Sequence, residues 1–398
     1  MLHANPRAIR ADYPPALRAI LDIGSARAAR RVLAGWDLLR LDTPLWDLPG
    51  LAASLGVAAI HVKDESRRSP LGSFKALGAP LALVRLLQRR FPRCSAADLV
   101  AGRCAKDVAG FTVISATDGN HGRALAAAAR SVGCRCVIVL HANVSAEREE
   151  PIAAQGARIV RIAGNYDESV REAAGLAARN GWQVVSDTSY EGYEEIPRDV
   201  MQGYAVIADE VFGPHDASPY THVFLQGGVG GLAAGIASHV WEKYGSRRPA
   251  LVVVEPEQAD CLLQSALAGR PAPAKGSVDS VMAGLACGEP SPLAWRFLDG
   301  SVDAFMTVGD AQAVQAMRVL ARGVDGDVPV LAGESGAAGL AGLQALAADG
   351  SRLAGIDGAS RILLINSEGA TAPRLYEELT GRAPDAVLRQ QASHALAG

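Results

Sequence analysis

Short runs of β-branched and other apolar residues alternate with alanine-rich stretches of helical period over most of this chain. Strands separated by helix-length connections run parallel, because the chain must cross back over the sheet before the next strand begins. A Pro-, Gly- and Asp-containing loop at 212–220 interrupts the alternation, which then restarts, so the sequence predicts two α/β units. The apolar runs are 111–115, 136–140, 158–162, 183–186, 222–226, 251–254 and 361–365.

Several alanine-rich or periodic stretches are expected to be helices. Near the N-terminus, Ala16 to Leu33 has helical period and is predicted as one helix. The other predicted helices are 120–132, 146–155, 166–180, 232–244, 258–267, 311–322 and 336–348.

Length and charge bound the kind of protein this can be. With 398 residues the chain can form about two domains of ~150–200 residues each, and its formal net charge is only −3. The balanced charge argues against a general nucleic-acid binder, and the apolar runs are far shorter than the ~20 residues of a membrane span. We therefore expect no nucleic-acid partner, no membrane insertion and a cytoplasmic location.

Cysteines and histidines give little sign of a metal or disulfide framework. The six cysteines lack the paired spacing of a zinc site, and the eight histidines are scattered. We expect most of the thiols to be buried and predict no metal site. The cysteines are Cys94, Cys104, Cys134, Cys136, Cys261 and Cys287.

The first segment with chemical content is 62–78, where Lys75 follows a serine and a phenylalanine at the expected start of a helix. The helix dipole and burial both lower the pKa of an amine placed there, which favours the neutral nucleophile required for a Schiff base. A solvated lysine at the beginning of a helix is the alternative interpretation.

The second segment, Ser115–Gly122, lies where a strand ends and a helix begins, and it contains Thr117, Asp118 and Asn120. Its two glycines allow backbone amides to turn inward, which is typical of an anion site for a substrate carboxylate. The Asn120 side chain could also bind a flat polar ring. An ordinary Asx helix cap would explain Asp118 or Asn120 alone.

The third segment is a glycine-rich loop between a strand and a helix. Its free amides and the helix dipole favour a phosphate. The spacing does not match a dinucleotide fingerprint, although Glu255 does follow a strand. The loop residues are Gly227, Gly228, Val229, Gly230 and Gly231.

In this order, the three segments resemble the motifs of the fold-type II pyridoxal-phosphate enzymes, which include the tryptophan synthase β-subunit, cysteine synthases and threonine dehydratases. Within that group the chain is most similar to the diaminopropionate ammonia-lyases over residues 40–375. The matching motifs are Lys63-Asp-Glu-Ser-Arg67, Ser73-Phe-Lys75-Ala-Leu-Gly78, Thr117-Asp-Gly-Asn-His-Gly-Arg123, Asp187-Thr-Ser-Tyr-Glu-Gly-Tyr-Glu-Glu-Ile-Pro197, Met282-Ala-Gly-Leu-Ala-Cys-Gly-Glu289 and Gly333-Glu-Ser-Gly336.

The resemblance implies an α/β fold of two domains, each a largely parallel sheet flanked by helices. Residues 1–85 and 205–398 would form the large cofactor-binding domain, and 86–204 the small domain with the Asp-Gly-Asn-His-Gly loop. It also implies a homodimer.

The resemblance further implies that pyridoxal 5'-phosphate is held by Lys75 as a Schiff base, with its phosphate at Gly227–Gly231. Asn120 would contact the ring hydroxyl and Ser367 the ring nitrogen. A hydroxyl there, unlike a carboxylate, cannot hold a full positive charge on the ring, which favours β-elimination over transamination.

The implied reaction is α,β-elimination of ammonia from the amino acid 2,3-diaminopropionate, giving pyruvate and two ammonia. Asp118 would take the α-proton of the D-isomer and Lys75 that of the L-isomer. Asp187 and Thr117 would bind substrate, with a carboxylate near the second amine; Asp187 could instead only cap a turn.

The sequence also departs from the family, with Arg68-Ser-Pro-Leu71 ahead of the lysine and Gly78-Ala79 after it. The same fold acting on serine, threonine or another β-substituted alanine is therefore an alternative, as is an anion-binding protein without catalysis.

Overall fold

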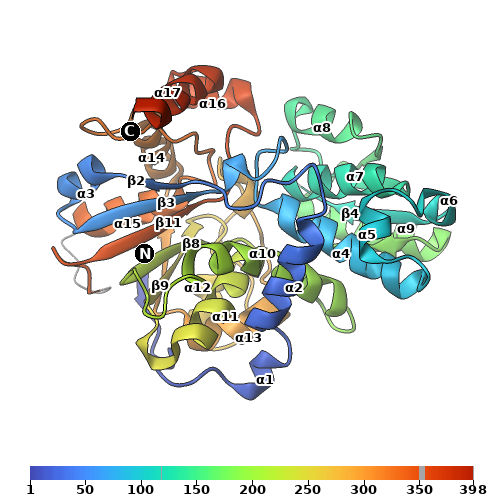
Figure 1. Cartoon of the computed structure of the whole chain (residues 1–398), viewed down its shortest axis with the longest axis horizontal. Helices are drawn as coiled ribbons and strands as arrows, with labels where there is room; N and C mark the ends of the chain where they lie inside the picture. The colour runs from blue at the N-terminus through green and yellow to red at the C-terminus, as the bar shows by residue number, and fades with distance from the viewer. Residues whose placement is uncertain (118, 349–354, 398) are drawn as a thin grey trace.

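Two sheets organise the chain in the computed structural model, which describes residues 1–117, 119–348 and 355–397 (Figure 1). All strand pairs are parallel except β1 with β10 and β2 with β3. The prediction of parallel-dominated α/β sheets is confirmed. In spatial order the larger sheet is β1 (Leu2–Ala4), β10 (Ala304–Val308), β9 (Ala250–Pro256), β8 (His222–Gln226), β11 (Arg361–Asn366), β3 (Ala59–Asp64) and β2 (Leu45–Asp47); the smaller is β6 (Arg158–Arg161), β5 (Arg135–Leu140), β4 (Thr112–Ala116) and β7 (Gln183–Val184).

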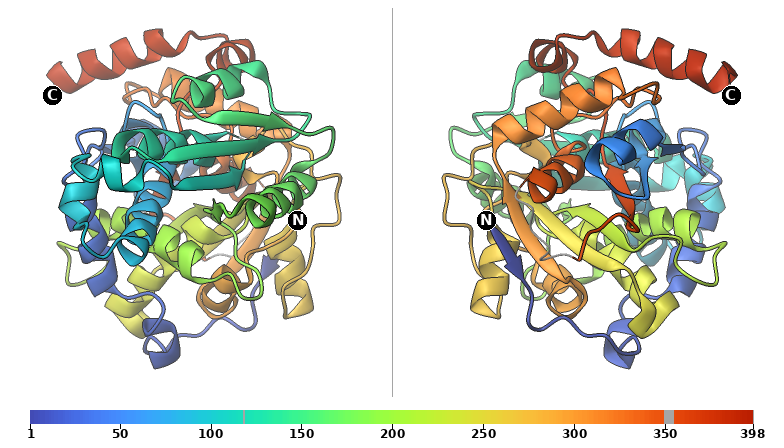
Figure 2. Two further views of the ribbon diagram at one scale, coloured as in Figure 1. Left: turned by 90° about the vertical axis from the view of Figure 1, so that its right-hand side faces the viewer. Right: turned by 90° about the vertical axis from the view of Figure 1, so that its left-hand side faces the viewer.

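Helices cover both sheets, and Figure 2 shows that the last of them, α17, runs along the outside of the molecule. No helix of the described residues is both long and apolar enough to cross a bilayer. In chain order the helices are α1 (Pro15–Arg18), α2 (Ile23–Leu33), α3 (Pro49–Leu55), α4 (Lys75–Arg90), α5 (Ala96–Val100), α6 (Ala105–Val108), α7 (Asn120–Val132), α8 (Ala146–Ala153), α9 (Tyr166–Asn180), α10 (Glu195–Phe212), α11 (Gly231–Tyr244), α12 (Cys261–Ala268), α13 (Pro292–Ser301), α14 (Asp310–Arg322), α15 (Ala338–Ala348), α16 (Pro373–Thr380) and α17 (Pro384–Ala397), with 3-10 turns η1 (Glu65–Arg67), η2 (Gly245–Arg247) and η3 (Ala283–Leu285).

One predicted element is wrong. The single helix expected over Ala16–Leu33 is two helices, α1 and α2. The chain turns between them because the Asp22 side chain accepts the backbone N–H of Ser25 and so caps the start of α2. The sequence pattern also missed β10 and the long buried helix α10.

Four of the six cysteines are free thiols, three of them buried, and the other two form a disulfide that the sequence did not predict. Cys94 and Cys104 form a disulfide, with their Cα atoms 6.2 Å apart. This separation lies within the range that a disulfide spans, and the connection bridges the segments before α5 and α6. Loop proximity of this kind depends on the fold and leaves no mark in the spacing of the residues.

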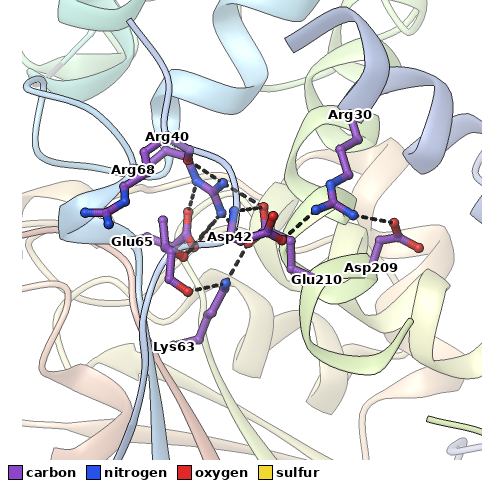
Figure 3. Close-up of polar contacts among 9 residues, drawn as sticks. Arg30, Arg40, Asp42, Lys63, Glu65, Arg68, Asp209 and Glu210 are labelled. Atoms are coloured by element: carbon purple, nitrogen blue, oxygen red, sulfur yellow. Dashed lines mark hydrogen bonds and ion pairs between the residues drawn. The ribbon is translucent and has the colours of Figure 1, made fainter. Parts of the chain in front are cut away.

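A cluster of four buried charges fastens the chain ahead of α4 to α10 (Figure 3). Arg68 Nε lies 2.8 Å from Glu65 Oε2, and Arg68 Nη1 lies 2.7 Å from Glu210 Oε1. Lys63 Nζ lies 2.6 Å from the other oxygen of Glu210. Burial opposes the charge on Glu210, yet Arg68 and Lys63 hold the pKa of its carboxyl below its usual value. The two cations and two anions balance, so each charge depends on the others.

Replacing Glu210 with glutamine therefore leaves a buried cationic excess. We expect E210Q to lower the free energy of unfolding by about 3–5 kcal/mol at pH 7. Because the pKa of Glu210 is lowered in the folded state, its contribution is full above its ordinary pKa of 4.5 and is lost as the pH falls below that value. Urea unfolding at pH 7 and 3.5 measures both effects.

The matched control is E172Q, which removes an exposed partner of Arg179 at 2.9 Å. It should change stability by less than about 0.5 kcal/mol. Equal small effects of the two variants would contradict the role assigned to the buried cluster.

Candidate active site

The main candidate site is a cavity at the carboxyl ends of strands from both sheets. In parallel α/β sheets, ligands bind at this edge. Thr117 follows β4, Asp187 lies shortly after β7, and Ser367 follows β11. The glycine loop 227–231 follows β8. The lining residues are Phe74, Lys75, Ala116, Thr117, Asn120, His121, Tyr166, Asp187, Tyr204, Gln226, Gly227, Gly228, Val229, Gly231, Leu232, Gly284, Leu285, Ala286, Cys287, Ser335, Ser367 and Glu368.

Lys75 is the first residue of α4 and points into this cavity. Its Nζ donates to the Asp187 carboxylate and lies 5.1 Å from the centre of the Phe74 ring and 5.8 Å from that of Tyr204. Burial would raise the pKa of Asp187, but the charges of Lys75 and His121 hold it well below its usual value. The site thus holds an ionised carboxylate against the amine.

The Thr117 and His121 side chains shape the turn into α7. Thr117 Oγ1 accepts the backbone N–H of Gly119 at 3.0 Å and of Gly122 at 3.1 Å. His121 Nε2 lies 2.9 Å from the carbonyl of Val185, and the neighbouring residue Asp118 lies outside the described residues. His121 is therefore held by the backbone of Val185, and its Nδ1 lies 3.7 Å from Asp187 Oδ2.

Asn120 extends from the same turn across the cavity. Its side-chain amide donates to the carboxylate of Glu368, which also accepts the backbone N–H of Ser335 at 3.1 Å. Ser367, one residue earlier, is buried and accepts the N–H of Phe74 on its carbonyl at 3.0 Å. Asn120, Ser367 and Glu368 therefore line one cavity with the glycine loop, and Asn120 contacts Glu368 directly.

The glycine loop has the conformation that an anion cradle requires. Gly228 and Gly230 have φ values of +65° and +98°, which side chains rarely tolerate, and the loop leads into the N-terminus of α11. A Cβ on Gly227 would lie 2.4 Å from Glu255 Cγ, so only glycine fits beside that carboxyl. Four of the five loop residues line the cavity, whereas Gly230 packs against α13.

Glu255 supports the loop from behind rather than binding a ligand. Its carboxyl oxygens accept the N–H groups of Leu262 and Leu263 at 2.8 and 2.7 Å, at the start of α12. Burial raises its pKa to about 8. Glu255 therefore links the start of α12 to the glycine loop at Gly227, which explains its place at the end of a strand without a dinucleotide.

The features of this cavity fit pyridoxal phosphate. It brings together a primary amine at Lys75, the backbone amides of the glycine loop ahead of α11, a side-chain amide at Asn120 and a hydroxyl at Ser367. The sequence had not indicated Phe74, Tyr166, Tyr204 or Glu368 as lining residues. Only Glu368 carried a signal, since it follows Ser367 at the end of a predicted strand.

Comparison with known proteins agrees with this geometry. The family model described as "Pyridoxal-phosphate dependent enzyme" matches residues 37–368. A diaminopropionate ammonia-lyase of Salmonella typhimurium is 38% identical over 352 residues, covering 85% of this chain and 87% of that protein. Its Escherichia coli counterpart is 36% identical over 372 residues, covering 91% and 92%.

Solved structures give the same result. The holo diaminopropionate ammonia-lyase of E. coli superposes with a TM-score of 0.87 and 34% identity, covering 96% of each chain. A second structure of that enzyme, with an aminoacrylate-PLP azomethine reaction intermediate, has a TM-score of 0.86. A plant threonine deaminase, at 20% identity and a TM-score of 0.71, shares the fold. This chain belongs to the pyridoxal-phosphate-dependent enzymes, and among them to the diaminopropionate ammonia-lyase family.

Proposed function

We propose that this enzyme eliminates ammonia from 2,3-diaminopropionate, D or L, to give pyruvate and two ammonia. The observation that carries the proposal is the ionised Asp187 carboxylate beside the Lys75 amine, in the cavity that the glycine loop also lines. A diamino acid brings a second ammonium group, and a buried carboxylate recognises it by a charge-assisted hydrogen bond.

For the cofactor, we assign attachment to the amine of Lys75 and the phosphate to the backbone amides of the loop 227–231. Asn120 would meet the ring hydroxyl and Ser367 the ring nitrogen. Bound pyridoxal phosphate would withdraw electrons from the α-carbon of the amino acid, so that the α-proton and the β-substituent can leave.

For the substrate, we assign three tasks to side chains of the protein. Lys75 would accept the α-proton of the L-isomer, and Asp118 that of the D-isomer from the opposite face. Asp187 would bind the β-ammonium. Thr117 would lie beside the substrate carboxylate, next to the Gly119 and Gly122 amides that its hydroxyl positions.

We also propose the domain division given by the sequence, with 1–85 and 205–398 as the large domain and 86–204 as the small one. The division of the strands between the two sheets supports this proposal, because β4 to β7 form a sheet of their own. A homodimer, which rests on the family resemblance, and a cytoplasmic location, which rests on the composition and the short apolar runs, complete the proposal.

A second candidate is elimination from serine. One structure of the E. coli relative is described as a complex with D-serine. Serine has a β-hydroxyl in place of the β-ammonium, so the carboxylate of Asp187 would lose its charged partner.

The first test is a visible spectrum of the purified protein, with pyruvate measured after each isomer of diaminopropionate is added. We expect a yellow protein that releases pyruvate from at least one isomer, because Lys75 and the glycine loop form one cavity. Serine, threonine and O-acetylserine serve as comparison substrates. Faster turnover of serine than of either diaminopropionate isomer would contradict the assignment. A protein that stays colourless and inactive with added cofactor would support a non-catalytic role.

Asp187→Asn tests recognition of the second amine. Loss of a charge-assisted hydrogen bond should raise KM for diaminopropionate about tenfold or more. Turnover of D-serine, which lacks that amine, should change less. Steady-state kinetics of the variant and the unaltered enzyme with both substrates gives the change in kcat/KM for each. An equal loss of kcat/KM for both substrates would mean that Asp187 acts only by positioning Lys75.

Asp118→Asn tests the two-base assignment. Removal of a general base should lower turnover of the D-isomer on the order of 100-fold or more. Turnover of the L-isomer should fall much less, because Lys75 serves its opposite face. The kcat values for the two pure isomers decide, and equal losses would refute separate bases.

A further inference from the structure

A second cavity, of about 520 Å3, lies behind the segment that leads to Lys75. We call it the arginine pocket, after Arg40, Arg67 and Arg123, which line it together with Ser69 and Thr371. Its walls come from six parts of the chain: residues 37–40 after α2, residues 66–72 in and after η1, Arg123 in the first turn of α7, Leu331, residues 369–371 after β11, and Leu388 of α17. None of these arginines lines the active-site cavity.

Arg123 carries an unsatisfied charge at this pocket. Its Nε is buried and makes no hydrogen bond, and the one hydrogen bond of its side chain among the described residues runs from Nη2 to the carbonyl of Pro70 at 3.4 Å. Burial lowers the pKa of Arg123, and no carboxylate within the described ranges pairs with it. A half-buried guanidinium without an anion is costly unless something fills the space beside it.

Thr371 presents a second unsatisfied group from the opposite segment. The residue is 8% exposed, and its Oγ1 makes no hydrogen bond. Ser69, also buried, accepts the N–H of Leu71 at 3.1 Å and keeps its hydroxyl proton for another acceptor. The pocket therefore contains a buried N–H of Arg123 and a buried hydroxyl of Thr371 that have no hydrogen-bond partner among the described residues.

The rim of the pocket is also positive. Arg40 and Arg67 form no ion pair with any carboxylate of the described chain, in contrast to Arg68. Figure 3 shows Arg40 at the edge of the buried cluster, where its backbone carbonyl accepts from Arg68. Asp37 is the one carboxylate that lines the pocket, so three positive side chains face one negative.

We propose that the arginine pocket is a second ligand site, which binds a small oxyanion: a phosphate or a carboxylate group. Arginine forks and hydroxyl groups are the donors that such oxyanions accept from. The ligand would neutralise Arg123 and accept from Thr371 and Ser69. This assignment does not depend on the proposed reaction.

The pocket adjoins the active site through its backbone. Gly72 and Gly369 both line it, and the N–H of Gly369 donates to the carbonyl of Gly72 at 2.9 Å. The next residues along the two segments, Ser73 and Glu368, form a β-bridge. A bound anion would therefore lie against the back of the segments that hold Lys75 and Ser367.

Calorimetric titration of inorganic phosphate into the holoenzyme tests the proposal, because the bound cofactor already occupies the glycine loop. We expect saturable binding with a dissociation constant of about 1 mM or tighter. Arg123→Gln and Thr371→Val should each weaken it, the former about tenfold or more. Arg130→Gln is the matched control, since Arg130 lies two turns further along α7, is exposed and lines another cavity.

A parallel titration with succinate distinguishes a carboxylate ligand from a phosphate. If Arg123→Gln fails to fold, Arg40→Gln replaces it, because Arg40 is exposed. Saturation by either anion that is lost in the pocket variants and kept in Arg130→Gln supports the site. Absence of saturable binding of both anions, or equal weakening in Arg130→Gln, overturns it.

Discussion

The buried charges of Lys63, Glu65, Arg68 and Glu210 are the constraint on which the active site depends. They join the end of β3 and the turn η1 to α10, at side-chain exposures of 3% or less. The chain then needs only six residues to pass from Arg68 to Lys75. Helix α10 also carries Tyr204, whose ring lies near the amine of Lys75. The cluster thus fixes both the approach to the lysine and one wall around it.

Holding two segments together with such a cluster has a large cost in desolvation free energy. Desolvation of four charges consumes most of their mutual attraction, so an apolar contact of equal size would stabilise as well. Buried ion pairs, however, are satisfied in only one arrangement of donors and acceptors, whereas apolar contacts tolerate several. Arg68 meets Glu65 and Glu210 at once, and it also donates to the carbonyl of Arg40 at 2.9 Å. The gain is a defined position rather than additional stability.

Polar side chains around the active site also fix the position of the chain through hydrogen bonds. Thr117 and His121 are occupied by backbone partners, and Glu255 is occupied by the start of α12. These hydrogen bonds hold the loops in place around Lys75, Asp187 and Asn120, which face the cavity together with Thr117 and His121.

The sequence pattern predicted those helices, strands and loops that are determined by neighbouring residues along the chain. β8 and the helices α7 and α9 have the bounds expected from apolar runs and helical period, and the glycine loop lies at a strand end as its composition indicated. The buried helix α10 escaped because Asp199, Asp209 and Glu210 resemble a solvated face. Their partners Arg85, Arg27 and Arg68 come from distant segments, and only the fold shows that these charges are buried. The disulfide of Cys94 and the orphaned Arg123 depend on tertiary contacts in the same way.

The strand order has a consequence for synthesis of the chain. β11 is the last strand to be made, yet it lies between β8 and β3 and alone joins the two halves of the larger sheet. The strand β3 ends at Asp64, and β11 ends at Asn366. At a ribosomal rate of ~5–20 residues per second, the edge of β3 waits roughly 15–60 s for its partner. During that interval β2 can already pair with one edge of β3, but the other edge has no partner within the chain and presents free backbone groups.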